Sequence, residues 1–137
     1  MERTGRRSES GTAAVEFAIV LPVLLLIVVG TLEWGRYFVV RESVVHAARE
    51  GARAGTLLDA ADADACVAAR AYLSTFGITA GCSTDMNHAI PGGGTTMPAV
   101  QVKLDVDFTA ITGLPLALPT TMHVEAVMPS WRPPAGG

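Results

Sequence analysis

The sequence predicts an α+β fold in which one long apolar helix precedes a small mixed module. Residues 12–32 carry a single charged side chain, that of Glu16. Residues 100–108 alternate between apolar and polar side chains, and residues 122–128 do so again, which is typical of strands with one buried face. We therefore expect a transmembrane and stalk helix, then an extracytoplasmic module with a short helix and an antiparallel β-pair or small sheet.

The first expected element is a membrane span. A helix that rises about 1.5 Å per residue needs roughly 20 residues to cross hydrocarbon about 30 Å thick, and residues 12–32 meet that length. A buried soluble helix is a weaker interpretation, because a chain of 137 residues would have to cover a helix that is apolar on every face. A cleaved signal peptide is also disfavoured, since its apolar run of about 7–15 residues ends at a small-residue site.

Arginines alone do not fix the orientation of the span, because similar numbers lie on its two sides. The arginines before and after it are Arg3, Arg6, Arg7, Arg36, Arg41 and Arg49. The short N-terminal segment and the position of both cysteines beyond the span favour a cytoplasmic N-terminus. We therefore expect a single-pass protein of the inner membrane with an extracytoplasmic C-terminal module.

The helix is expected to continue beyond the membrane as a stalk, which gives one helix over residues 12–58. Apolar or small residues recur there at steps of three or four and draw one stripe. They are Tyr37, Val40, Val44, Ala47, Gly51, Ala54 and Leu58. Pro22 predicts a helix kink or a melted turn over residues 18–22, unless the membrane helix simply tolerates this proline.

Aromatic and charged residues mark the point where the helix leaves the membrane. Trp34 and Tyr37 are expected to be interfacial anchors. Glu33 and Arg36 are three residues apart, so an ion pair between them would contribute about 0.2–0.5 kcal/mol.

The charged segment around Gly51 has two interpretations. Arg49, Glu50 and Arg53 form either a solvated helix face or a contact surface for another subunit, where Gly51 would allow close packing. Glu50 and Arg53 also have the spacing of an ion pair. The sequence alone does not separate the two interpretations.

Residues 59–130 are expected to form the small module, which begins with a second helix over residues 60–76. Asp59 and Asp62 resemble a capping pair at its start, and Gly77 ends it. The apolar face of this helix is formed by Cys66, Ala69, Leu73 and Phe76.

The two alternating segments, residues 100–108 and 122–128, are joined by a connection with glycine and prolines, which suits an antiparallel pair. Two strands alone are marginally stable, so the helices should cover them. Residues 83–97 are polar and glycine-rich and are expected to form a mobile loop. Residues 131–137 are expected to form a flexible tail.

Cys66 and Cys82 are the only cysteines. In an oxidising compartment a disulfide between them would contribute about 3 kcal/mol, and we prefer it to free thiols. A zinc site is disfavoured, because its ligands would be these two residues with His88 and His123, at spacings that match no common pattern. We expect no metal and no cofactor.

No catalytic constellation is found in the sequence, so an enzyme is not expected. The three histidines are scattered and accompany no nucleophile motif. The acidic residues near the start of the second helix lack the glycine and distal glutamate of a calcium-binding loop. A formal net charge of −3 disfavours nucleic-acid binding.

The segment that opens the apolar helix is similar to the processing site of type IV pilin-like proteins. A short basic leader ends at Gly11, small or apolar residues follow, and Glu16 and Phe17 begin the helix. Many subunits of this group have tyrosine where this chain has Phe17. The later string Ala-Ala-Arg-Glu-Gly-Ala-Arg-Ala, residues 47–54, resembles more narrowly the TadE-like family of Tad (tight adherence) pilus minor pilins, or pseudopilins.

The resemblance implies that a prepilin peptidase removes the cytoplasmic leader, residues 1–11, and leaves Thr12 as the N-terminus. It further implies assembly through the helix, out of membrane lipid, with a major pilin and other minor pilins at an inner-membrane pilus assembly platform. The filament would serve surface adhesion. The resemblance covers residues 11–53 well and the C-terminal module only in outline.

Glu16 is central to this interpretation. After cleavage its carboxylate could pair with a protonated α-amine, and such a pair costs far less in hydrocarbon than either charge alone. The simpler alternative is an acid favoured by the macrodipole at a helix N-terminus. The alternative function is an uncleaved single-pass membrane protein whose outer module binds a periplasmic partner.

Overall fold

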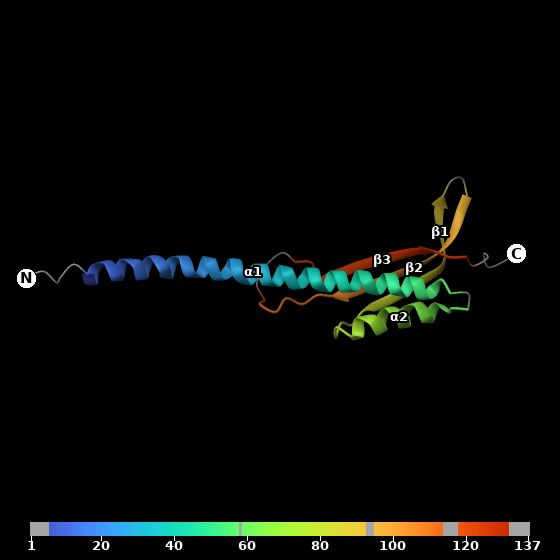
Figure 1. The fold of residues 1–137 in the computed structure, drawn as a ribbon, viewed down its shortest axis with the longest axis horizontal. Helices are drawn as coiled ribbons and strands as arrows, with labels where there is room; N and C mark the ends of the chain where they lie inside the picture. The colour runs from blue at the N-terminus through green and yellow to red at the C-terminus, as the bar shows by residue number, and fades with distance from the viewer. Residues whose placement is uncertain (1–5, 58, 93–94, 114–117, 132–137) are drawn as a thin grey trace, which may run out of the picture.

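The structure consists of one long helix and a small α+β head, which confirms the predicted fold class (Figure 1). The computed structural model describes residues 6–57, 59–92, 95–113 and 118–131. The elements in chain order are α1 (Arg6–Gly55), α2 (Asp62–Ser74), β1 (Gly81–Gly92), β2 (Thr95–Asp107) and β3 (Thr121–Pro129). We call residues 59–131 the head. The N-terminal half of α1 extends well beyond it (Figure 1).

Helix α1 is continuous over 50 residues, from Arg6 to Gly55. The prediction of one long continuous helix is therefore confirmed, although the helix begins before residue 12 and ends before residue 58. Residues 18–22 remain helical, so the melted turn expected near Pro22 is wrong, while a kink there stays a prediction. An apolar window with a mean hydropathy of 2.7 makes α1 long and apolar enough to cross a membrane.

The head contains an antiparallel sheet with the strand order β1-β2-β3. Strand β2 pairs with β3 from Ala99 opposite Pro129 to Asp107 opposite Thr121, which confirms the predicted pair. The loop expected over residues 83–97 is wrong, because most of this segment forms β1 and the start of β2.

Strand β1 was not predicted, because the side chains that it turns toward the helices are only weakly apolar. Thr84, which lies opposite Val102 on the face toward the helices, is a polar residue, and among the described side chains of β1 only that of Met86 is buried. A register shift between Asp85 and His88 further interrupts the pattern. An edge strand of this kind resembles a polar loop when only its sequence is inspected.

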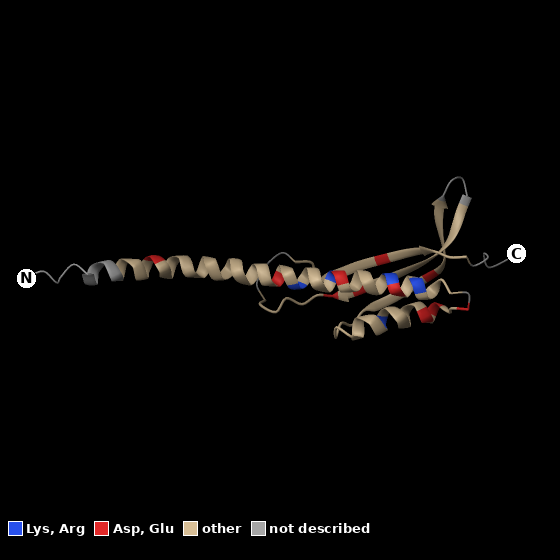
Figure 2. Cartoon of the chain, in the orientation of Figure 1, with Lys and Arg blue, Asp and Glu red and all other residues tan. Residues whose placement is uncertain are grey.

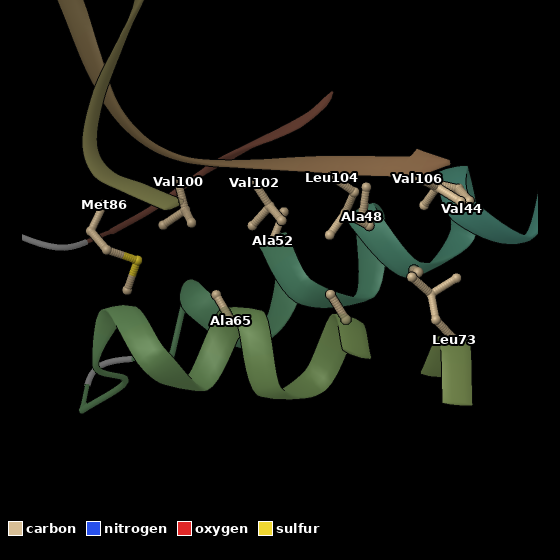
Figure 3. Close-up of a cluster of buried hydrophobic side chains, with 12 residues drawn as sticks. Val44, Ala48, Ala52, Ala65, Leu73, Met86, Val100, Val102, Leu104 and Val106 are labelled. Atoms are coloured by element: carbon tan, nitrogen blue, oxygen red, sulfur yellow. The ribbon is translucent and has the colours of Figure 1, made fainter. Parts of the chain in front are cut away.

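The two helices cover one face of the sheet. Helix α1 contacts β2 and β3, whereas α2 packs beside α1 and contacts β1. Figure 3 shows the small side chains of α1, such as Ala48 and Ala52, between the valines and leucine of β2 and the side chains of α2. The buried cluster is Val44, Ala47, Ala48, Ala52, Ala65, Ala69, Leu73, Met86, Val100, Val102, Leu104 and Val106.

Glycines on α1 set how closely these layers approach. A Cβ atom on Gly51 would lie 2.7 Å from the carbonyl oxygen of Ala65 and 2.9 Å from the Cβ of Ala69. A Cβ atom on Gly55 would lie 2.8 Å from a methyl of Val100. The predicted stripe is thus confirmed as far as Gly51, but it continues through Gly55 rather than Ala54, and Leu58 lies outside the described residues.

Helix α2 is shorter than expected and begins with a different cap. Its N-cap is Ala61, whose N–H donates to the Asp64 carboxylate at 2.7 Å, so the predicted Asp59 and Asp62 cap is wrong. It ends near Gly77, which has a φ of 67°. Phe76 is 55% exposed and does not belong to the buried face.

The other face of the sheet is polar, as the alternation predicts. Lys103 lies opposite Glu125, and Asp105 lies opposite His123 with 2.6 Å between a carboxylate oxygen and the ring Nδ1. Gln101 is the exception on this face, because it is buried and donates to the Glu125 carboxylate at 3.2 Å.

Candidate assembly helix and its junction with the head

The N-terminal half of α1 makes the largest apolar surface of the described chain. Large side chains from Val15 to Leu32 are mostly exposed, including Phe17 at 61% and Leu25 at 52%. The head lies against the other half of the helix (Figure 1). Apolar surface on this scale requires a cover of lipid or of other protein.

Gly11 is not required by packing. A Cβ atom there would meet no atom within 4 Å beyond its own helix, and the residue sits inside α1. Glycine costs about 1 kcal/mol relative to alanine in a helix interior, and packing within the described chain does not offset this cost at Gly11. Thr12 follows it in the same helix and is exposed.

The side chain of Glu16 is exposed and makes no hydrogen bond or ion pair with another side chain or with the backbone in the described part of the chain. Glu16 is the single charged residue among residues 12–32, and Figure 2 shows the N-terminal half of α1 mostly in the colour of uncharged residues. A lone carboxylate in hydrocarbon is costly, so a membrane location of this part of α1 would favour a cation beside Glu16.

At the other end of the apolar stretch, Glu33 joins α1 to the head. Its side chain is only 4% exposed, and Oε1 accepts hydrogen bonds from the backbone N–H groups of Ile111 at 2.5 Å and Thr112 at 3.4 Å. A buried carboxylate that accepts backbone N–H groups forms charge-assisted hydrogen bonds, which are stronger than neutral ones.

Arg36 makes a second contact with the same connection between β2 and β3. Its Nη1 donates to the carbonyl oxygen of Thr109 at 2.8 Å, and its guanidinium carbon lies 4.8 Å from the centre of the Phe108 ring. The expected ion pair between Glu33 and Arg36 is therefore wrong, because each side chain binds the connection instead.

Sequence reasoning missed this junction, although one signal was present. Glu33 lies four residues before Tyr37 and so extends the apolar stripe of the stalk toward the membrane. An acidic residue on a buried stripe requires a fixed polar partner. Its identity is not readable from the sequence, because that partner is a backbone segment far along the chain.

The aromatic residues near the junction divide into two roles. Tyr37 is half-buried and meets Phe108 edge to face with 5.3 Å between the ring centres, so it packs on the head more than it faces the surroundings. Trp34 and Phe38 are 40% and 57% exposed, with ring centres 5.8 Å apart. Of the two expected interfacial anchors, only Trp34 has the exposure for that role.

The charged segment around Gly51 is also divided. Gly51 is buried against α2, so its close packing occurs within the chain and the suggested subunit contact at this residue is corrected. Arg49, Glu50 and Arg53 are exposed. The predicted pair of Glu50 with Arg53 is confirmed at 3.7 Å.

Cys66 and Cys82 form the expected disulfide, with 5.8 Å between their Cα atoms. The bond joins α2 to the edge strand β1 and occupies both thiols, so neither is available as a zinc ligand. Within the described residues, no three His, Cys, Asp or Glu side chains are grouped so that they could hold a metal ion.

Comparison of the sequence with known protein families gives a match that lies entirely within α1. The family model for TadE-like proteins matches residues 11–53. No curated protein and no solved structure matches the chain. The matched segment includes Gly11, Glu16, Glu33 and Gly51 and stops two residues before α1 ends. Over residues 11–53, the chain is similar to the TadE-like family.

Proposed function

We propose that the protein is a minor pilin, or pseudopilin, of a Tad pilus, assembled through the N-terminal half of α1 after a prepilin peptidase removes residues 1–11. The observation that carries the proposal is an exposed apolar half-helix with one unpartnered carboxylate, Glu16, at the fifth position after Gly11. The TadE-like family match over this helix supports the same role in a pilus.

Cleavage after Gly11 supplies the cation that Glu16 lacks. It creates a protonated amine on Thr12, one helical turn from Glu16 or, in a filament, on the helix of a neighbouring subunit. Pairing the two charges lowers their combined cost in an apolar surrounding far below that of either alone. Phe17 beside this pair adds an aromatic side chain to the contact surface.

The proposed subunit stands in the inner membrane with its N-terminus in the cytoplasm and its head outside. The disulfide of the head supports this orientation, because such bonds persist in oxidising compartments. The exposed charges of Arg49, Glu50 and Arg53 face away from the core and form a contact surface for a sister subunit. The partners are the peptidase, the assembly platform, a major pilin and other minor pilins, in biogenesis or at an adhesive tip.

A matched pair of glycine variants tests the proposal in a host with an active prepilin peptidase. Gly11→Val and Gly35→Val each place a branched side chain at an open position on the same helix. Gly11→Val is expected to stay uncleaved and to be missing from filaments sheared off the cell surface, because the peptidase must approach the backbone closely. Gly35→Val is expected to be cleaved and recovered like the unmodified protein.

Two results would count against the proposal. One is normal cleavage and recovery of Gly11→Val. The other is an unmodified protein that remains entire in the membrane and never enters the filament fraction, which would favour an uncleaved single-pass protein with a partner-binding head.

A further inference from the structure

The connection between β2 and β3 is held at the membrane end of the head. Glu33 binds the N–H groups of Ile111 and Thr112, and Arg36 binds the carbonyl oxygen of Thr109. Leu32, the last residue of the uncharged stretch, directly precedes Glu33. At a helical rise of about 1.5 Å per residue, the backbone of Ile111 is thus fixed within a few ångströms of the end of the apolar stretch.

Ile111 turns its side chain away from the protein at this level. It is 75% exposed, although both its own N–H group and that of the next residue are bound to a buried carboxylate. Trp34 and Phe38, two exposed aromatic residues of α1, lie one and five residues after Glu33. Two N–H groups and one carbonyl group of the described part of the connection are hydrogen-bonded, and the apolar side chain of Ile111 is left exposed.

The charges at this level are directed inward and satisfied by the connection. Glu33 is nearly inaccessible, and Arg36 is half-buried with its guanidinium against the Phe108 ring. An unsatisfied carboxylate next to hydrocarbon would be costly, whereas this arrangement presents isoleucine and tryptophan to the outside. Apolar side chains with satisfied backbone groups are what the boundary between headgroups and acyl chains accepts.

We propose that Ile111 inserts into the lipid interface beside α1, so that the head touches the membrane at a second point. The proposal rests on the membrane span proposed for α1, and the partner is a lipid surface. A second contact away from the helix axis restricts how the head tilts and rotates before the subunit leaves the membrane. The contact covers only the described residues 109–113 of this connection.

Single-cysteine labelling of the full chain in lipid vesicles tests the proposal. Leu25→Cys, Ile111→Cys and Val67→Cys each receive an environment-sensitive fluorophore, while the native cysteines are bonded and unreactive. Val67 is the matched control, because it is an aliphatic residue of the head that is 62% exposed on α2. The vesicles contain phosphatidylcholine and phosphatidylglycerol, with a fraction of lipid carrying a nitroxide quencher high on the acyl chain.

The probe at position 111 is expected to be quenched several-fold more than the probe at position 67 and to show blue-shifted emission. Adding Glu33→Ala, which releases the connection, should remove most of that quenching, whereas adding Glu42→Ala should not. Quenching at position 25 with none at position 111 would overturn the lipid contact and leave the span intact. Absence of quenching at position 25 would overturn both the membrane span of α1 and the lipid contact of Ile111. Protection of the probe at position 111 from iodide, without quenching by the lipid nitroxide, would overturn the lipid contact and indicate a protein contact instead.

Discussion

The Glu33 carboxylate on α1 accepts a hydrogen bond from the backbone of Ile111, although 78 residues separate the two in the chain. This contact joins the end of the apolar stretch of α1 to the connection between β2 and β3. With the hydrogen bond from Arg36 to Thr109, it fixes the head to the helix at the point where the helix leaves the proposed membrane. These hydrogen bonds therefore hold the head in a fixed position on α1.

Removing the Glu33 carboxylate is expected to destabilise the head. Glu33→Ala removes the acceptor of the hydrogen bonds from the N–H groups of Ile111 and Thr112, which should lower the free energy of unfolding by about 1–3 kcal/mol. Glu33→Gln keeps an acceptor oxygen and should lose less. Urea unfolding in detergent measures the change, and amide hydrogen exchange at Ile111 and Thr112 localises it.

The matched control is Glu42→Ala, since Glu42 is an exposed acid on the same helix. This change should alter stability by no more than about 0.5 kcal/mol. Equal stability of the Glu33→Ala and Glu42→Ala variants would show that the junction contributes nothing to the fold.

Adding one methyl group at Gly51 is expected to separate α1 from α2. Gly51→Ala places a Cβ atom 2.7 Å from the carbonyl oxygen of Ala65, so the free energy of unfolding should fall by about 1–3 kcal/mol. Gly35→Ala occupies an open position and should be neutral or stabilising by up to about 1 kcal/mol. The urea midpoints of the two variants measure the contrast, and a stabilised Gly51→Ala variant would contradict the close packing.

Opening the disulfide is expected to loosen the edge of the sheet. Reduction of the bond between Cys66 and Cys82 should lower the free energy of unfolding by about 3 kcal/mol. Because the bonded cysteines have no free thiol, alkylation should occur only after reduction, and the oxidised and reduced chains should differ in gel mobility. Thiols that react fully without a reductant would show that the bond is absent from the native protein.

Neutralising Glu16 is expected to separate processing from assembly. Glu16→Gln keeps the shape of the side chain but cannot attract the amine of Thr12, so cleavage should proceed while filament recovery falls markedly. Glu16→Asp retains the charge and should preserve part of the assembly. Immunoblots of sheared surface fractions measure filament recovery. Normal filament recovery of Glu16→Gln would contradict the proposed pairing of Glu16 with the amine of Thr12.

Local sequence patterns predicted much of the fold. The strict alternation in residues 100–108 predicted the central strand, because every second side chain there is strongly apolar and buried. The apolar stretch before Glu33 predicted the long helix because its length and composition suit a membrane span. Strand β1 was missed, since its inward side chains include that of the polar Thr84 and its register shifts between Asp85 and His88.

The candidate site was predictable only where it is local in the sequence. Gly11, Glu16 and Phe17 form a short pattern that can be recognised without a structure. The roles of Glu33 and Gly51 depend on elements distant in the chain, the connection after β2 for one and α2 for the other. A spacing of three residues suggested an ion pair for Glu33, but tertiary contacts provided better partners.

The N-terminal sequence of the protein recovered from its own membranes tests the central claim most directly. The account predicts a chain that begins at Thr12, with a mass lower than that of the full sequence by residues 1–11. The same preparation from cells without prepilin peptidase should begin at the original N-terminus. An intact Met1 in cells with an active peptidase would contradict the account, because Glu16 would then never meet the amine that cleavage creates.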